Sequence, residues 1–266
     1  MSHVLVCLEG SPSSAAASQM AIALAREQNA QLTGLAISDL GAAVASVAGG
    51  LASAGAGETT AYLEGFARTC RSAGLSARLI TRVGHPADII LDEMSNYDVT
   101  VIGREASFVT AGGDGSSIRD RILRGARRLV LLVPAESAAA PGLGKSVLVA
   151  YDGSAPSEHA LDSFMRSGLP AKRDIHVVTV GDDGEKAWDV ATHAVEKLQS
   201  FGVRAVTHNL VSRLRESEAL LELGREIGAG LVVMGAFAHS RLTELIHGSG
   251  TREVVAHSPV PICLQH

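Results

Sequence analysis

Residues 231–264, LVVMGAFAHSRLTELIHGSGTREVVAHSPVPICL, contain the pattern that decides the fold. The stretch opens with a short apolar run, 231–234, that is half β-branched and is followed by Gly235. Such a run is typical of a strand buried in a parallel sheet. After a loop, the small residues 248–251 lead into a helical run that ends before two prolines, and a short apolar strand follows. A small-residue turn at the start of a helix presents free backbone amides, which are the groups that bind phosphate.

This stretch resembles the nucleotide motif of the universal stress protein family, G-x2-G-x9-G-(S/T). Gly235 and Gly248-Ser249 stand at its first and last positions, whereas Ala238 replaces the second glycine. The resemblance implies a five-stranded, doubly wound sheet that binds ATP at the carboxyl ends of its strands. If position 238 requires a positive φ, the alanine costs roughly 1–2 kcal/mol, which leaves the strength of binding open.

The chain contains this unit twice. HVLVCLEGS at 3–11 matches SVLVAYDGS at 146–154, and VIG at 101–103 matches VMG at 233–235. The first pair is offset by 143 residues and the second by 132, so about eleven extra residues fall within the first copy. We assign them to an Ala/Gly/Ser-rich insertion at 41–57. The repeat predicts two domains, 1–136 and 144–266, joined by a Pro/Gly/Ala-rich linker.

Each copy alternates short apolar runs with amphipathic runs, which predicts parallel strands joined by right-handed crossovers. The expected strands are 4–8, 31–37, 76–81, 99–102 and 129–133, then 146–151, 174–180, 203–209, 230–234 and 262–264. The expected helices are 13–28, 59–73, 86–95 and 117–125, then 155–167, 184–201, 214–227 and 251–257. The fold class is therefore α/β: two Rossmann-like, doubly wound domains, each a mostly parallel five-stranded sheet flanked by helices. Because unpaired sheet edges seek a partner, we expect the two closing strands to join the halves as a pseudo-dimer.

The composition narrows the class of protein. Hydrophobic residues make up 46% of the 266 positions and aromatic residues only 3%, as in an α/β core built from Ala, Val and Leu. The net charge is −5 with no basic stripe, which argues against nucleic-acid binding. Three widely spaced cysteines, Cys7, Cys70 and Cys263, indicate a reducing compartment rather than a disulfide framework or zinc site. We expect no signal peptide and no membrane span, hence a cytoplasmic protein.

Candidate ligand residues gather in the second copy. Asp152 follows the first strand and precedes a Gly-Ser turn, a position that suits a ribose hydroxyl or a hydrated Mg²⁺; a helix cap is the alternative. The resemblance places Ala150, Tyr151 and Val180 against the adenine, with ordinary core packing as the alternative. The expected phosphate cradle is Gly235, Ala238, Gly248, Ser249, Gly250 and Thr251. A plain Ser/Thr helix cap, and for Gly235 a tight turn, are the alternatives there.

The first copy departs from the motif at the matching places. Glu9 replaces the aspartate, Ala106 stands at the second glycine, and Ser116-Ser117 replaces the Gly-Ser pair. We therefore expect at most one nucleotide per chain, ATP with or without Mg²⁺, held by the second copy.

Stronger enzyme signatures are absent from the sequence: it has no G-x4-G-K-(S/T), G-x-S-x-G or H-E-x-x-H. By resemblance, the chain is expected to be a tandem universal stress protein that acts by binding adenine nucleotide, with slow ATP hydrolysis at most and no assigned catalytic residue. A homodimer is compatible with this reading, and no protein client can be named. Two alternatives stay open: an interaction protein that has lost nucleotide binding, and an ATP-using enzyme such as an adenylyl transferase.

Overall fold

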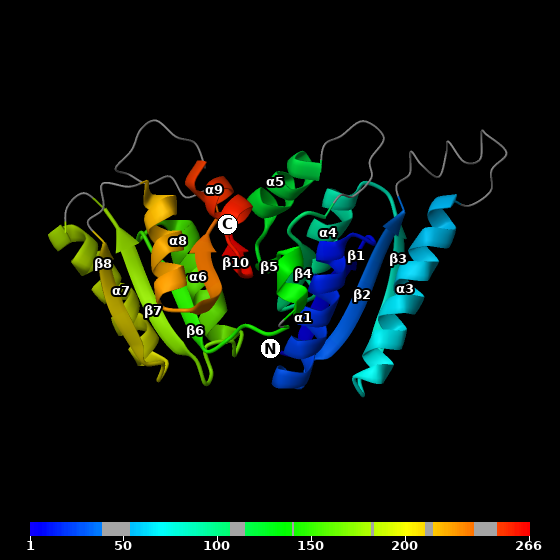
Figure 1. Cartoon of the computed structure of the whole chain (residues 1–266), viewed down its shortest axis with the longest axis horizontal. Coiled ribbons are helices and arrows are strands. Elements are labelled where there is room, and N and C mark those ends of the chain that lie inside the picture. Colours follow the sequence, from blue (N-terminus) through cyan, green and yellow to red (C-terminus); the bar gives the residue numbers. More distant parts are fainter. Residues whose placement is uncertain (39–53, 107–114, 140, 182–183, 211–214, 237–248) are drawn as a thin grey trace. The chain divides into compact units, whose positions relative to one another are not determined.

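The computed structural model describes residues 1–38, 54–106, 115–139, 141–181, 184–210, 215–236 and 249–266. These residues form two compact units, Met1–Pro141 and Gly142–His266 (Figure 1). Both units alternate strands with helices along the chain. No helix in the described ranges is long and apolar enough to cross a lipid bilayer.

The first unit is a parallel five-stranded sheet in the order β3-β2-β1-β4-β5. Contacts place α1 over β1 and β4, and α3 over β2 and β3, while α4 packs against α5. In chain order its elements are β1 (His3–Leu8), α1 (Pro12–Gln28), β2 (Gln31–Ser38), α3 (Ala54–Ser72), β3 (Ala77–Val83), α4 (Pro86–Met94), β4 (Val99–Gly103), α5 (Gly115–Gly125), β5 (Leu129–Val133) and the 3-10 helix η1 (Ala135–Ala139).

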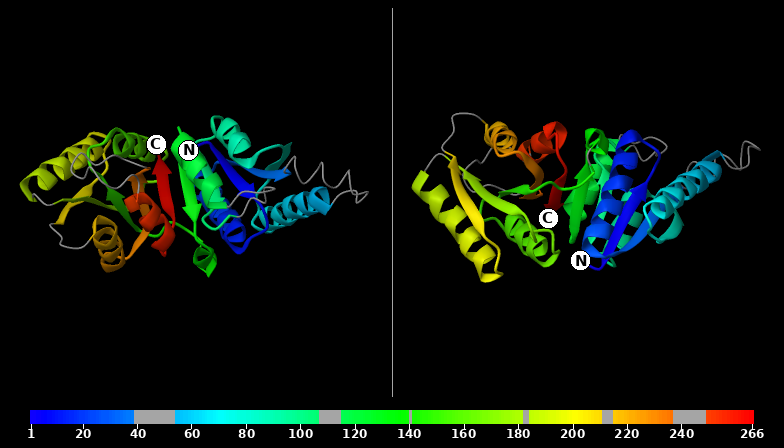
Figure 2. Two further views of the ribbon diagram at one scale, coloured as in Figure 1. Left: turned by 90° about the horizontal axis from the view of Figure 1, so that it is seen from above. Right: turned by 60° about the horizontal axis from the view of Figure 1, so that its bottom comes forward.

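The second unit repeats this topology with the order β10-β9-β6-β7-β8, again with parallel pairs. Helices α6 and α7 cover one face of the sheet, and α8 and α9 cover the other (Figure 2). Its elements are β6 (Ser146–Ala150), α6 (Ala155–Arg166), β7 (Asp174–Val180), α7 (Gly184–Ser200), β8 (Ala205–Leu210), α8 (Glu216–Glu226), β9 (Ala229–Gly235), α9 (Ser249–His257) and β10 (Ile262–Gln265). The doubly wound α/β fold expected from the sequence is confirmed.

Helices on both faces explain the apolar runs of the central strands. All five residues of β4 and all five of β5 are buried, so these strands show no alternation of polar and apolar positions. The thiols of Cys7, Cys70 and Cys263 are also buried and unpaired with one another, as small apolar groups of the core.

The same turn leads from the first strand into the first helix of each unit. Gly10 and Gly153 have φ values of +87° and +73°, which a residue with a Cβ rarely adopts. The next residue caps the helix: the Ser14 amide donates to Ser11 Oγ at 3.1 Å, and the Ser157 amide donates to Ser154 Oγ at 3.3 Å. This turn fixes the residue that precedes each glycine at the carboxyl edge of the sheet.

Most predicted elements are observed within two residues of their expected ends. The largest difference is α3, which begins at Ala54 rather than at 59, so the helix takes in the end of the 41–57 insertion. Residues 41–53 of that insertion lie outside the described part. Helix α8 begins at Glu216 rather than at 214, because Arg215 has an extended backbone and Glu216 and Glu218 suit the positive end of the helix.

Candidate functional site

The carboxyl edge of the second sheet brings together three of the predicted site positions. Asp152 follows β6, Val180 ends β7 and Gly235 ends β9, and these three strands are neighbours in the sheet. Helix α9 follows β9 in the chain and begins at Ser249. Parallel sheets bind ligands at this edge, where strand ends and helix N-termini meet.

The Asp152 side chain is exposed and partly engaged by its own turn. Its Oδ1 accepts a hydrogen bond from the Ser154 amide at 3.0 Å. The helix cap itself is made by Ser154, whose Oγ accepts from the amide of Ser157. Asp152 therefore orders the turn without being buried by it, and its carboxylate lies at the surface of the edge.

Both backbone polar groups of Tyr151 are hydrogen-bonded. Its amide donates to Val178 O at 2.9 Å, and its carbonyl accepts from Thr179 Oγ1 at 2.7 Å. Its side chain is only 3% exposed, and the hydroxyl donates to Glu158 on α6. The structure therefore places the aromatic ring in the space between helices, and only the backbone of Tyr151 reaches the edge.

Ala150 and Val180 are the partly exposed residues at the ends of otherwise buried strands. In β6 the three residues before Ala150 are buried, and in β7 the three residues before Val180 are buried. Ala150 pairs with Val178, so Val180 extends the sheet surface two residues further on the neighbouring strand. Small apolar side chains that are open at a strand end suit contact with the flat, apolar face of a heteroaromatic ring.

Gly235 has a packing role that sequence reasoning missed. A Cβ built on it would lie 2.5 Å from the Ser157 amide nitrogen and 2.7 Å from Pro156 C. Those atoms belong to the first turn of α6, so the absence of a side chain lets α6 pack against the end of β9. Gly103 does the same in the first unit, where its Cβ would lie 2.7 Å from the Ser14 nitrogen. The match of Gly103 with Gly235 between the two copies was the sequence signal for this shared contact.

The predicted phosphate cradle is described only in part. Gly250 is exposed and Thr251 is 6% exposed in the first turn of α9, while Ser249 is described by its backbone alone. Ala238 and Gly248 lie outside the described residues. The described portion is thus a helix N-terminus with a small exposed residue, which presents amides and the positive end of the helix dipole.

A charged cluster stands behind the β6 turn. Lys197 Nζ on α7 donates to Glu158 Oε2 at 2.5 Å and to Asp162 Oδ1 at 2.7 Å, and His193 Nε2 lies 3.4 Å from Glu158 Oε1. Burial acts to raise the pKa of Glu158, but hydrogen bonds from Lys197 and Tyr151 outweigh it and hold the pKa below its ordinary value. Burial and the Glu158 hydrogen bond both raise the pKa of Tyr151. The cluster joins α6 to α7 and holds both helices beside the site.

A tyrosine lies beside the matching turn of the first unit. A Cβ built on Gly10 would lie 2.7 Å from Tyr62 Oη, so the Tyr62 ring of α3 lies against the turn after β1. Glu9 Oε1 accepts hydrogen bonds from the amide and the hydroxyl of Ser11. Burial, Glu58 and Glu9 raise the pKa of Tyr62.

The two units differ at the residue that faces this turn. Tyr62 precedes Gly74 by twelve residues, and Val190 precedes Gly202 by twelve residues. Both glycines end their helices with a positive φ, so Tyr62 and Val190 are equivalent positions. Val190 Cγ1 lies 3.6 Å from a Cβ built on Gly153, an ordinary contact. Sequence reasoning missed this difference, which an alignment of the two helices on their terminal glycines would have found.

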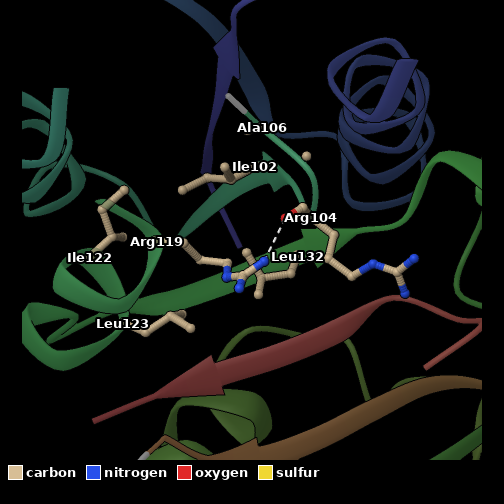
Figure 3. A pocket seen from close by; sticks show the side chains of 8 residues that line it. Ile102, Arg104, Ala106, Arg119, Ile122, Leu123 and Leu132 are labelled. Carbon is tan, nitrogen blue, oxygen red and sulfur yellow. Dashed lines mark hydrogen bonds between the residues drawn. The ribbon is translucent and has the colours of Figure 1, made fainter. Parts of the chain in front are cut away.

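A small cavity lies beside β4 in the first unit (Figure 3). Its volume is about 10 Å³, room for about one water molecule. Arg119 Nη1 donates to Arg104 O at 3.1 Å across it, and Arg104 is paired with Glu105 and Glu136. It is lined by Ile102, Gly103, Arg104, Ala106, Arg119, Ile122, Leu123 and Leu132.

The described residues contain no group of three or more His, Cys, Asp or Glu side chains that could hold a metal ion. Asp152 stays the residue that the sequence predicts for Mg²⁺ bound together with nucleotide phosphates and water. An exposed carboxylate with one oxygen in a single hydrogen bond fits that chemistry, because Mg²⁺ keeps several waters and takes one or two carboxylates.

Comparisons with known proteins agree on the family. The family model described as the universal stress protein family matches residues 1–134 and again residues 144–264. A universal stress protein of Synechocystis is 28% identical over 199 residues, which cover 73% of this chain and 67% of that protein. The crystal structure of a universal stress protein from Archaeoglobus fulgidus has a TM-score of 0.76 at 22% identity, covering 99% of this chain and 97% of that one. A second structure, described as a putative universal stress protein from Pseudomonas aeruginosa, has a TM-score of 0.57 at 15% identity, covering 99% of this chain and 92% of the other.

Proposed function

The chain belongs to the universal stress protein family, and from that premise we propose that its second unit binds one adenine nucleotide, ATP with Mg²⁺. The adenine lies near Ala150 and Val180, and the ribose and the metal lie near Asp152. The phosphates lie on the N-terminus of α9 and on the loop before it, at Gly235, Ala238, Gly248, Ser249, Gly250 and Thr251. The protein acts in the cytoplasm by binding rather than by dedicated catalysis.

One observation carries this proposal: Asp152 is exposed after β6, whereas the matching Glu9 after β1 is only partly exposed and a tyrosine lies against its turn. Asp152 is exposed beside partly open strand ends, and Val190 only touches the turn. In the first unit Tyr62 lies against the matching turn, and Glu9 Oε1 accepts hydrogen bonds from both the amide and the hydroxyl of Ser11. Among the described residues, this difference favours the second copy as the one that binds the nucleotide.

Electrostatics support an anionic ligand at α9. The first turn of α9 contains no acidic residue, so its amides and dipole are not neutralised from within that turn.

The three free, buried thiols support a reducing compartment and thus the cytoplasm.

Native mass spectrometry of freshly purified protein tests the proposal. We expect a mass increase that matches one ATP per chain, and its loss in Asp152→Ala and in Gly248→Val while circular dichroism stays unchanged. Glu9→Ala is the matched control in the first unit and should keep the nucleotide. A protein that neither retains nor takes up nucleotide would instead favour the interaction protein of the same fold. Turnover of added ATP would favour the enzyme.

A further inference from the structure

Two histidines that are 32 residues apart in the sequence meet on the second sheet. His176 Nδ1 on β7 lies 2.9 Å from His208 Nε2 on β8, and the ring centroids are 5.2 Å apart. His176 pairs with Val206 across the two strands, and His208 pairs with Val178. Both imidazoles therefore project from the same face of the sheet, and their positions on the neighbouring strands differ by two residues in register.

This part of the sheet face is partly open to solvent. A Cβ built on Gly224 of α8 would lie 3.5 Å from Leu148 Cδ2, so α8 packs on this face over β6, and it also contacts β7. His176 is the neighbour of Leu148 on the next strand out, and both histidines are only partly buried. Val206, beside His176 on β8, is 57% exposed. An ion from solvent can therefore reach the pair.

The distance between the two nitrogens can be compared with the distance between two ligand atoms on one metal ion. Two imidazole nitrogens about 2.05 Å from one ion and at right angles to each other are about 2.9 Å apart, whereas tetrahedral ligands are about 3.3 Å apart. The observed separation of 2.9 Å is that of a hydrogen bond between the two rings, and it also equals the spacing of neighbouring ligands of a square-planar or octahedral ion. Nitrogen ligands in that geometry are typical of Cu²⁺ and Ni²⁺.

The hydrogen bond between the two rings contains one N–H proton. Burial and the neighbouring His176 lower the pKa of His208, while Glu226 near the end of α8 acts in the opposite direction. One shared N–H proton leaves to solvent when a metal takes its place.

The pair is specific to the second unit. His176 and His208 correspond to Thr33 and Ile80, because β6, β7 and β8 pair with the same register as β1, β2 and β3. Neither Thr33 nor Ile80 can bind a transition metal in this way. The fold alone therefore does not require imidazoles at these positions.

We propose that His176 and His208 form a two-histidine site for a divalent transition metal, Cu²⁺ or Ni²⁺. The site lies on the α8 side of β7 and β8. Water completes the coordination, since no third His, Cys, Asp or Glu among the described residues forms a metal-sized group with them. The site is separate from the nucleotide edge, and the proposal does not depend on nucleotide binding.

Copper titration with glycine as a competing ligand, followed by electron paramagnetic resonance, tests this site. All proteins carry His3→Ala, so that His3 and the terminal amine do not compete for Cu²⁺. The His3→Ala protein, which is the parent of the other variants, should bind one Cu²⁺. Its electron paramagnetic resonance spectrum should show two nitrogen ligands. His176→Ala and His208→Ala should each weaken binding at least tenfold and leave a one-nitrogen signal, and the double variant should lose the site.

Two further variants separate a metal ligand from a structural hydrogen bond. His208→Asn keeps a hydrogen-bonding side chain on β8 but should lose copper as His208→Ala does. His159→Ala removes an exposed histidine from α6 and should leave copper binding unchanged. Equal copper affinity and an unchanged signal in the parent and the folded double variant would overturn the proposal.

Discussion

Substituting Gly235 by alanine should destabilise the second unit through a contact that is visible in the structure. The new methyl group would lie 2.5 Å from the Ser157 nitrogen and 2.7 Å from Pro156 C, both in the backbone of the first turn of α6. Backbone atoms cannot rotate away as a side chain does, so α6 must shift. That shift would also strain the cap, because the Ser157 amide is the donor to Ser154 Oγ.

The size of the effect follows from the contact. Overpacking a close-packed site lowers the free energy of unfolding by about 1–3 kcal/mol. Because this clash is with rigid backbone, we expect a loss in the upper part of that range, about 2–3 kcal/mol. The second unit runs from 142 to 266, which is 125 residues. At about 2.1 cal/mol/K per residue, its unfolding entropy is roughly 0.26 kcal/mol/K, so we expect its melting temperature to fall by roughly 8–12 °C.

Differential scanning calorimetry of the full chain measures this directly. Gly224→Ala is the matched control in the same unit, because its methyl would lie 3.5 Å from Leu148 Cδ2, an ordinary contact, within a helix that favours alanine. Gly103→Ala should lower the melting temperature of the first unit by a similar amount. The reasoning is refuted if Gly235→Ala melts within about 2 °C of the wild type.

Three other outcomes are expected. Val190→Tyr should lower ATP affinity at least tenfold in calorimetry, by covering the β6 turn as Tyr62 covers the β1 turn; unchanged affinity would contradict the covering role. A thiol reagent should label no cysteine of the native protein rapidly, because burial raises the pKa of Cys263 to about 12 and of Cys70 to about 11; rapid labelling of either thiol would contradict their burial. The folded-state pKa of Glu158 is lowered, so its contribution to stability is present above about pH 4.3 and is lost as the pH falls through the folded pKa. Chemical denaturation between pH 7 and pH 3 should therefore show a smaller loss of stability in Glu158→Gln than in the wild type, and equal losses would count against this role.

The fold could be predicted from the sequence because its signals are local and repeated. Short apolar runs such as 129–133 are buried on both faces, and the Gly-Ser turns at 10–11 and 153–154 set the helix starts. The two copies supply these signals twice, so each confirms the other. The start of α3 was missed because an Ala/Gly/Ser stretch carries no hydrophobic periodicity.

The site could be predicted only as positions along the chain. Asp152, Val180 and Gly235 lie at one edge, as parallel strand ends must. The direction of each side chain depends on packing that no local pattern contains. The Tyr151 ring turns towards Glu158, Gly235 makes room for α6, and His176 meets His208 from another strand.

The number of nucleotides bound per chain tests the central claim most directly. In a calorimetric titration of ATP with Mg²⁺, we predict one site in the wild type, which Gly248→Val abolishes and Glu9→Ala and Ser116→Val leave unchanged. Ala238→Gly should tighten binding by about tenfold if roughly 1.4 kcal/mol of strain is relieved. Two sites per chain, or loss of binding on Glu9→Ala, would contradict the assignment of the nucleotide to the second unit.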